Sequence, residues 1–297
     1  MINQLHHISA FTKNATENYD FYATVLGLRL VKNTVNQENT TMRHLFYGDY
    51  EGTPGTLLTF FEIPKLGHRV DKKSYFSTVS LAVPSHSLDY WQRRFADFKI
   101  PTTLENNELL VEDNDGFKIA LVEMEEQIAP HKATKHTSIP ANKQIIRIAK
   151  VSIVADQFKE TQRFLSDYLS LKQENDTFFT EQHLDQTTVL ASQSKDRTRF
   201  GRGTIDHIAY GVDSNDELEG FYQQALTDQW TIEEYVDRGY FKSLYIKEPS
   251  GLRIELATLS PGFQLDESLE ELGTHLALPP FLEKNRTAIE AQLEEIK

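Results

Sequence analysis

The chain has 297 residues with 39% hydrophobic and 25% charged side chains, a formal net charge of −13 and no cysteine. These values fit a globular protein long enough for two domains, and they exclude disulfides and thiolate metal sites. Because no apolar run approaches roughly 18 residues, no leader pattern opens the chain and no basic run offsets its acidity, we expect a cytoplasmic protein without a membrane or nucleic-acid partner.

Four segments of the chain repeat one outline: an alternating strand, a polar turn, an amphipathic helix and then further strands. We call them modules one to four. Their first strands read LHHISAFT at 5–12, FSTVSLAV at 76–83, IAKVSIVA at 148–155 and IDHIAYGV at 205–212. The residues expected to cap the four helices at their N-termini are Asn14, Ser85, Asp156 and Ser214.

The polar, unpatterned stretch 131–144 separates the second module from the third. It divides the chain into modules one and two at 1–130, modules three and four at 145–260, and a tail at 261–297. In the tail, a Pro–Pro pair precedes a predicted helix at 282–296, LEKNRTAIEAQLEEI. We expect the tail to cover one domain or an oligomer interface, and together with exposed sheet edges it is compatible with a homodimer.

Two adjacent histidines, His6 and His7, stand in the first strand. Neighbouring residues of a strand point to opposite faces of the sheet, so only one of the two is expected to face inward. When the four first strands are aligned, the inward position holds His7, Val79, Val151 and His207 in modules one to four. Modules two and three therefore carry a core residue where modules one and four carry an imidazole.

The last strand of module four differs from its counterparts in the same way. Glu255 stands four residues after Gly251, whereas the corresponding residue is Thr59 in module one and Ala120 in module two. A glutamate in so apolar a strand is costly to bury as an ion unless it is paired or binds a metal. Two neutral imidazoles and one carboxylate on neighbouring strands suit Fe(II) and leave coordination positions open, and Mn(II) accepts the same set.

A single inward histidine is more often a hydrogen-bonded core residue than a metal ligand. Two histidines at equivalent positions, together with Glu255, favour the metal interpretation for His7 and His207. His44, in RHLFYGD, either lines a pocket or bonds to a backbone carbonyl. The remaining histidines fall in loops, turns or polar surroundings: His68, His86, His131, His136, His183 and His275.

These features resemble the vicinal-oxygen-chelate superfamily, and within it the ring-cleaving, extradiol-type dioxygenases that act on hydroquinones. The stretches that carry the resemblance are LHHISAFTKNATENYDFYATVLGLRLVKNTVN, HLFYGDYEGTPGTLLTFF, GTIDHIAYGV, DRGYFKSLYIKEPSGLRIELATLSPGF and LALPPFLEKNR. The resemblance implies an α+β fold of four βαβββ modules that form two cup-shaped mixed sheets, with a C-terminal helical tail.

His7, His207 and Glu255 match the Fe(II) ligands of this family. One ion can take ligands from modules one and four only if these two modules form one cup. Modules two and three then form a second cup without a metal. The catechol-cleaving relatives pair their modules differently, one with two and three with four.

Four further residues are the catalytic candidates that the resemblance implies. Tyr245 matches a tyrosine beside the substrate, and Arg238 matches an arginine near the pocket. His6, like Ser9, matches a polar position of the first strand. Asp206 stands where this branch often has histidine. If that position takes part in proton transfer or sets the substrate preference, this protein differs from the family in that respect.

The leading hypothesis is an Fe(II)- and O2-dependent ring-cleaving dioxygenase of hydroquinone-like aromatic diols, with quinone or hydroquinone detoxification as the role that the resemblance suggests. One alternative is a glyoxalase-type metal-dependent isomerase or lyase, which typically uses a fourth protein ligand. Thr59 at the module-one position argues against it, while Glu62 or another loop residue stays open as that ligand. The other alternative is a non-catalytic small-molecule-binding protein, such as a drug-sequestering one, which has no need of a His, His, Glu set.

Overall fold

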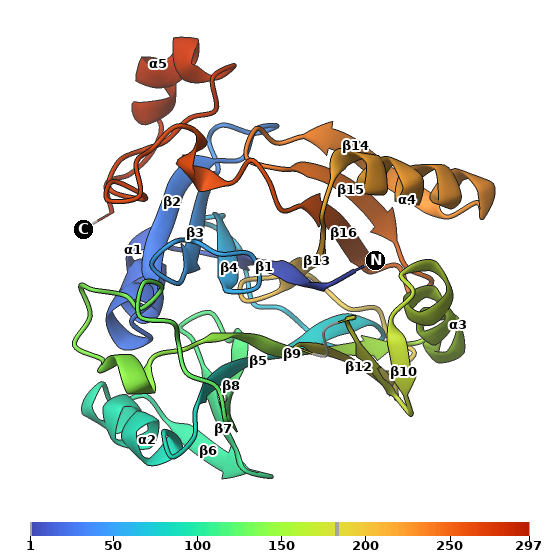
Figure 1. Cartoon of the computed structure of the whole chain (residues 1–297), viewed down its shortest axis with the longest axis horizontal. Coiled ribbons are helices and arrows are strands. Elements are labelled where there is room, and N and C mark those ends of the chain that lie inside the picture. Colours follow the sequence, from blue (N-terminus) through green and yellow to red (C-terminus); the bar gives the residue numbers. More distant parts are fainter. Residues whose placement is uncertain (1, 182–183, 297) are drawn as a thin grey trace.

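The computed structural model describes residues 2–181 and 184–296, so His183 lies outside the described residues. Each module folds as a strand, a helix and three further strands, which confirms the predicted α+β class (Figure 1). Module one contains β1 (Gln4–Thr12), α1 (Ala15–Tyr19), β2 (Arg29–Val35), β3 (Arg43–Gly48) and β4 (Leu57–Glu62). Module two contains β5 (Tyr75–Pro84), α2 (Leu88–Asp97), β6 (Thr102–Glu105), β7 (Glu108–Glu112) and β8 (Lys118–Met124).

The second half of the chain repeats this order. Module three contains β9 (Arg147–Ala155), α3 (Phe158–Arg163), β10 (Lys172–Glu174), β11 (Thr177–Phe179) and β12 (Gln186–Ala191). Module four contains β13 (Ile205–Val212), α4 (Asn215–Thr227), β14 (Thr231–Asp237), β15 (Lys242–Lys247) and β16 (Arg253–Thr258). The tail carries the short helix α5 (Arg286–Glu290).

The described strands form two mixed sheets of eight. Sheet one runs β14-β15-β16-β13-β1-β4-β3-β2 and joins modules one and four; sheet two runs β10-β11-β12-β9-β5-β8-β7-β6 and joins modules two and three. The predicted pairing of module one with module four, and of module two with module three, is therefore confirmed. At the centre of each sheet two first strands meet antiparallel, β1 with β13 and β5 with β9. Each is flanked by the parallel last strand of its own module.

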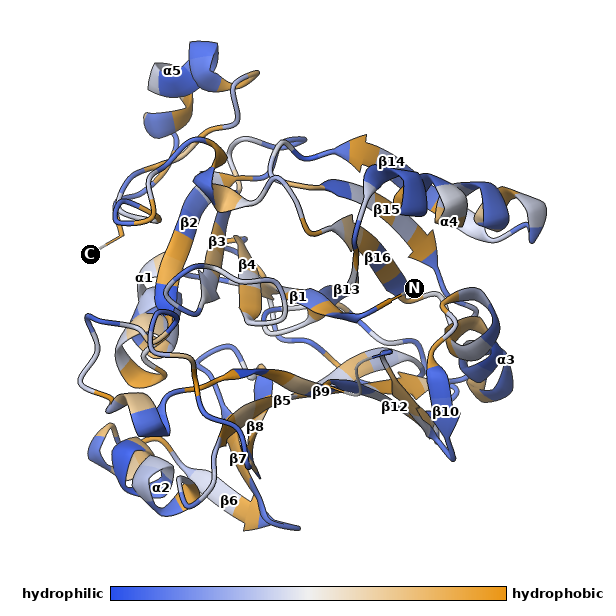
Figure 2. Cartoon of the chain, viewed as in Figure 1, coloured by the Kyte–Doolittle hydropathy of each residue, from blue (hydrophilic) through white to orange (hydrophobic). Residues whose placement is uncertain are grey.

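An apolar core joins the two sheets, which lie one above the other in Figure 1. The ring of Phe60 on β4 lies 5.7 Å from that of Phe117, which precedes β8. Helices α2 and α4 carry hydrophobic and hydrophilic residues on different faces (Figure 2). Helices α1 and α3 continue into π-helical turns, Asp20–Val25 and Phe164–Tyr168, each of which buries three large side chains.

Two of the four predicted helix caps are confirmed. The side chains of Asn14 and Ser214 accept the backbone N–H of the residue three positions later. Ser85 and Asp156 do not cap, because both side chains have partners on other strands and loops. At α2 the carboxylate of Glu123 on β8 accepts the N–H groups of the first turn instead.

The tail covers the β2 edge of sheet one. The side chain of Lys32 is fully buried and pairs with Asp266, 2.7 Å away, and with Glu267. Gly273 lies so close to β2 that an added Cβ would stand 1.9 Å from the Leu30 carbonyl oxygen. The helix predicted at 282–296 is shorter in the structure, a 3-10 turn followed by α5, because α5 buries a single side chain against the body.

The connections between the two sheets lie side by side. Val70, in the segment before β5, exchanges two backbone hydrogen bonds with Arg199, in the segment before β13. Gly201 has no room for a side chain there, since a Cβ would lie 2.2 Å from the backbone nitrogen of Arg69.

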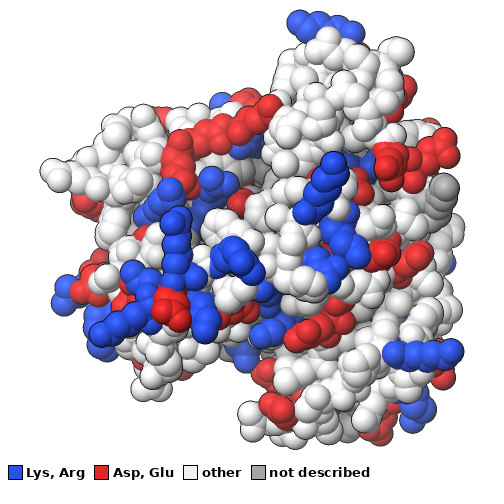
Figure 3. Space-filling model, turned by 180° about the vertical axis from the view of Figure 1, so that it is seen from behind, with Lys and Arg blue, Asp and Glu red and all other residues white. Residues whose placement is uncertain are grey.

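The back of the molecule gathers Lys and Arg side chains, with Asp and Glu among them, in one area (Figure 3). Within 2–181 and 184–296 there is no helix with the length and apolarity needed to cross a bilayer.

Candidate metal centre

Three side chains converge at the centre of sheet one: His7 from β1, His207 from β13 and Glu255 from β16. Nε2 of His7 lies 3.1 Å from Oε2 of Glu255, and Nε2 of His207 lies 2.9 Å from the same oxygen. The two Nε2 atoms are 3.2 Å apart. All three residues are buried. The described part of the chain holds no other group of three His, Asp or Glu side chains that converges in this way.

This triangle fits one divalent cation. With ligand bonds of roughly 2.1 Å, two ligand atoms at right angles about a metal stand about 3 Å apart, as these three do. Oε1 of Glu255 accepts a hydrogen bond from Ser243 at 2.6 Å, whereas the buried Oε2 faces Nε2 of His7 and Nε2 of His207. A buried carboxylate oxygen that faces two imidazole nitrogens is an arrangement that a cation can satisfy.

The electrostatics of the triad favour a positive charge at its centre. Burial alone would raise the pKa of Glu255, but the charges and hydrogen bonds of His7 and His207 hold it well below its usual value. Burial lowers the pKa of His7. The hydrogen bonds of His207 to Asp206 and Glu255 outweigh its burial and raise its pKa to about 9.

Asp206 orients His207 from behind. Its Oδ2 accepts a hydrogen bond of 2.7 Å from Nδ1 of His207 and a second one of 3.1 Å from the guanidinium of Arg253. Burial opposes the charge of Asp206, but these two partners keep its pKa low. A proton held on Nδ1 leaves Nε2 free to face the triad, which is how carboxylates commonly position metal-binding histidines.

The alternation expected for His6 and His7 is wrong. The register of β1 with β13 shifts between Leu5 and His7, so His6 sits in a β-bulge. Both imidazoles are therefore buried on the same side, with their Nδ1 atoms 2.9 Å apart and both rings against Phe241. His6 touches His7 directly rather than pointing away from it.

Tyr245 and Arg238 lie on the wall of a small cavity in front of the triad, of about 60 Å³. The ring of Tyr245 meets that of His207 edge-on, with the centroids 5.4 Å apart. The guanidinium of Arg238 lies 5.3 Å from the centre of the Tyr245 ring. Other residues of the wall are Ser9, Thr34, Val35, Asn36, Gln37, His44, Phe46, Phe61, Tyr240 and Phe241.

His44 belongs to this wall, with Nε2 2.9 Å from Oγ1 of Thr59 and its ring stacked on Phe61. The turn between β2 and β3, which contributes Gln37, is the part of the site that the sequence did not indicate. Its residues are ordinary turn residues, and only the fold brings them opposite module four.

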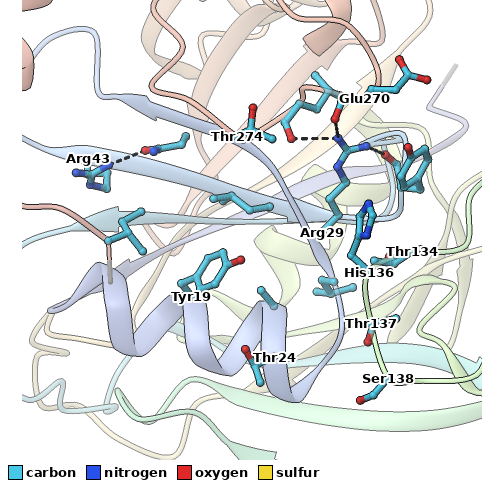
Figure 4. Close-up of a pocket in the computed structure, with 18 of the residues that line it drawn as sticks. Tyr19, Thr24, Arg29, Arg43, Thr134, His136, Thr137, Ser138, Glu270 and Thr274 are labelled. Carbon is cyan, nitrogen blue, oxygen red and sulfur yellow. Dashed lines mark hydrogen bonds between the residues drawn. The ribbon is translucent and has the colours of Figure 1, made fainter.

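A larger cavity, of about 890 Å³, lies elsewhere, between α1, β2, the segment 134–138 and the tail (Figure 4). Arg29 spans it and donates to the backbone oxygens of Tyr50, Glu270 and Leu272. These bonds fasten the tail to β2, and no converging set of ligands lies among the residues that line this cavity. Volume alone would thus select the wrong place for metal chemistry.

The alignment of modules two and three is wrong by one residue. In module four, His207 pairs with Arg253, which stands two residues after Gly251. In module two, the residue two positions after Gly116 is Lys118, and its partner on β5 is Thr78. Opposite Ser80, the counterpart of Ser9, stands Lys150. Thr78 and Lys150 are therefore the structural equivalents of the two histidines, whereas Val79 and Val151 lie in the core.

Comparison with known proteins places this fold and site in a family. The model of the glyoxalase/bleomycin resistance protein/dioxygenase superfamily matches residues 4–121. The whole chain is 35% identical to the "putative ring-cleaving dioxygenase MhqA" of Bacillus subtilis strain 168 and covers 99% of that protein. The chain belongs to the glyoxalase/bleomycin resistance protein/dioxygenase superfamily, as the resemblance predicted.

Two further comparisons concern the whole chain. A crystal structure titled as a putative dioxygenase from Bacillus subtilis subsp. subtilis strain 168 matches with a TM-score of 0.92 and 28% identity, over 100% of this chain and 98% of that one. The chlorohydroquinone/hydroquinone 1,2-dioxygenase of Sphingobium indicum is 24% identical over 95% of this chain and 93% of that protein. Both matches span all four modules.

Proposed function

We propose that this protein is an Fe(II)- and O2-dependent dioxygenase that cleaves the ring of hydroquinone-like aromatic diols. The observation that carries the proposal is the buried triad of His7, His207 and Glu255, because two histidines and one carboxylate with open positions are typical of non-haem iron oxygenases. The names of the relatives support the reaction and the substrate class. Removal of toxic hydroquinones and quinones is the physiological role that follows.

His7, His207 and Glu255 would hold the ion. When bound, Fe(II) would act as a Lewis acid that lowers the pKa of a phenolic hydroxyl, and it would couple the transfer of electrons from the ring to O2. Mn(II) accepts the same ligands. Asp206 and Ser243 fix the outer sides of the ligands, so the ligand atoms keep their orientation without the metal.

Tyr245 and Arg238 line the cavity on the substrate side of this site, whereas His6 acts through its contact with His7. Burial and the charge of Glu255 raise the pKa of Tyr245, so its hydroxyl is a hydrogen-bond donor rather than a phenolate. Arg238, whose guanidinium lies beside the Tyr245 ring, opposes part of that shift. Burial and His7 lower the pKa of His6 to about 3, so it exchanges a hydrogen bond with His7 while staying neutral.

Among the described residues, neither Thr59 nor Glu62 joins the triad as the fourth ligand that the isomerase alternative needs. Thr59 bonds to Ser9 and His44 through its hydroxyl. The carboxylate of Glu62 accepts the N–H of Ala15 at the start of α1, away from the triad. A pure binding protein, in turn, has no need of a buried carboxylate that faces two imidazoles.

The proposal is tested by loading the metal-free protein with Fe(II) without oxygen and then measuring O2 uptake. Hydroquinone, methylhydroquinone and catechol are the substrates, and the His7→Ala variant is the control. We expect uptake with the two para-diols that is lost in His7→Ala. Uptake with catechol alone would overturn the substrate class, and no uptake by protein with one bound metal would overturn the reaction.

A further inference from the structure

The wall of the metal-site cavity carries a single Lys or Arg among its described residues, Arg238. An arginine on the wall of an aromatic-binding cavity would ordinarily attract a carboxylate on the ring, because its planar guanidinium binds carboxylates through two parallel hydrogen bonds. The charge around this arginine therefore bears on which ring substituents the site accepts.

Arg238 is already paired with two carboxylates that come from different modules. Glu234, four residues earlier on β14, receives a hydrogen bond of 2.7 Å. Glu38, in the turn between β2 and β3, receives one of 3.1 Å. The side-chain amide of Gln37 donates to the backbone oxygen of Arg238 at 2.6 Å and holds that turn in place. One guanidinium thus already faces two carboxylates, so it has no unmatched positive charge to offer a carboxylate on the ring.

Glu38 lies beside this cavity, because its neighbours Asn36 and Gln37 line the wall and its carboxylate pairs with Arg238. The cavity of about 60 Å³ is smaller than the roughly 150 Å³ that accommodates benzene in an engineered protein cavity. Part of the wall must therefore move when a ring enters. The strands that carry the triad lie in the middle of the sheet, whereas the side chain of Glu38 is 64% exposed on a turn. A ring substituent that points toward Arg238 therefore meets the carboxylate of Glu38.

We propose that Glu38 is a specificity-determining residue which, with Glu234, reserves the site for uncharged aromatic diols and rejects rings that carry a carboxylate. This inference rests on the proposed function. A ring carboxylate that approaches Arg238 must compete with Glu38, whose own charge stays nearby and repels it. Methyl and chloro substituents are uncharged, so Glu38 does not repel them in this way.

The test compares methylhydroquinone with 2,5-dihydroxybenzoate, which is a hydroquinone with one carboxylate. The wild type, Glu38→Gln and the control Glu105→Gln, an exposed glutamate on β6 of sheet two, are loaded with Fe(II). We expect Glu38→Gln to raise kcat/KM for the carboxylated ring about tenfold and to leave methylhydroquinone within about twofold. The gain should shrink between low and high salt, since it is electrostatic. Glu105→Gln should change neither.

Binding of both rings to the Fe(II)-loaded protein without oxygen, measured by calorimetry, gives a second readout that needs no turnover. An absence of O2 uptake with both rings would contradict the proposed function, while a higher affinity of Glu38→Gln for the carboxylated ring would still support the inference. Equal kcat/KM for the two rings in the wild type would overturn it, as would equal changes for both rings in Glu38→Gln.

Discussion

The two sheets share one topology and one register, yet only sheet one has a triad. Where sheet one has His7, His207 and Glu255, sheet two has Thr78, Lys150 and Thr188. The amine of Lys150 pairs with Glu108 at 2.8 Å, so sheet two supplies its own cation. The fold fixes where ligands can meet, and three side chains decide whether a metal site exists there. This difference leads us to expect one metal ion per chain, in sheet one.

The largest effect is expected from Glu255→Gln. The change removes the one carboxylate of the triad, and a neutral amide is a weak ligand for a hard divalent ion. Affinity for Fe(II), followed by anaerobic calorimetry, should fall by about 100-fold or more, and O2 uptake should be lost. Thr188→Ala at the equivalent position of sheet two should leave both unchanged. Wild-type affinity in Glu255→Gln would remove Glu255 from the site.

Asp206→Asn should have a smaller effect on the same site. The amide can still accept a hydrogen bond from Nδ1 of His207, but it carries no negative charge to make that imidazole a stronger metal ligand. Loss of such outer partners typically costs about 10- to 100-fold in metal affinity. Asp156→Asn, which alters a carboxylate beside β9 that pairs with Lys73, is the matched control. An affinity equal to that of the wild type would show that Asp206 does not position His207.

Two buried carboxylates should also respond differently to pH, Asp185 and Glu255. Burial raises the pKa of Asp185, which accepts the backbone N–H of Leu5, to about 6. The unfolded value is about 4, so the contribution of Asp185 to the free energy of unfolding increases as the pH falls through about 6. The pKa of Glu255 is depressed instead, so its contribution is lost only as the pH falls below its usual range.

Asp185→Asn isolates the first effect. Between pH 7.5 and pH 5, the metal-free wild type should gain about 1 kcal/mol of stability relative to this variant. Denaturant unfolding at the two pH values measures the difference. A difference that does not change with pH would mean that Asp185 is ionised normally in the folded protein.

The smallest effect is expected from Lys150→Met in sheet two. The side chains of Lys150 and Glu108 are 27% and 28% exposed, so their ion pair is partly screened by water. Its loss should cost at most about 1 kcal/mol of stability and leave metal affinity unchanged. A weakened metal site in this variant would show that the two sheets are coupled rather than independent.

Much of sheet one could be predicted from the sequence. A charged residue in an apolar strand is a strong signal, because burial without a partner is so costly, and Glu255 and His207 both gave it. Ligands on modules one and four then required these modules to share a sheet. The repeat supplied the element order, since each module shows the same change from alternating to helical periodicity.

Other features depend on long-range contacts that no local pattern reports. The bulge at His6 breaks the alternation on which its expected orientation rested. The one-residue error at Val79 and Val151 arose because both Thr78 and Val79 fit an alternating strand, so only the hydrogen-bond register distinguishes them. Glu38 lies 200 residues from Arg238 in the chain, and only the folded sheet brings the two together.

The most direct test of the comparison is an anaerobic titration of Fe(II) into the metal-free wild type, His7→Ala and Lys150→Met, with bound metal counted per chain. We predict one ion per chain in the wild type and in Lys150→Met, and none bound tightly in His7→Ala. Two ions per chain, or one ion retained by His7→Ala and lost in Lys150→Met, would contradict a single metal site in sheet one.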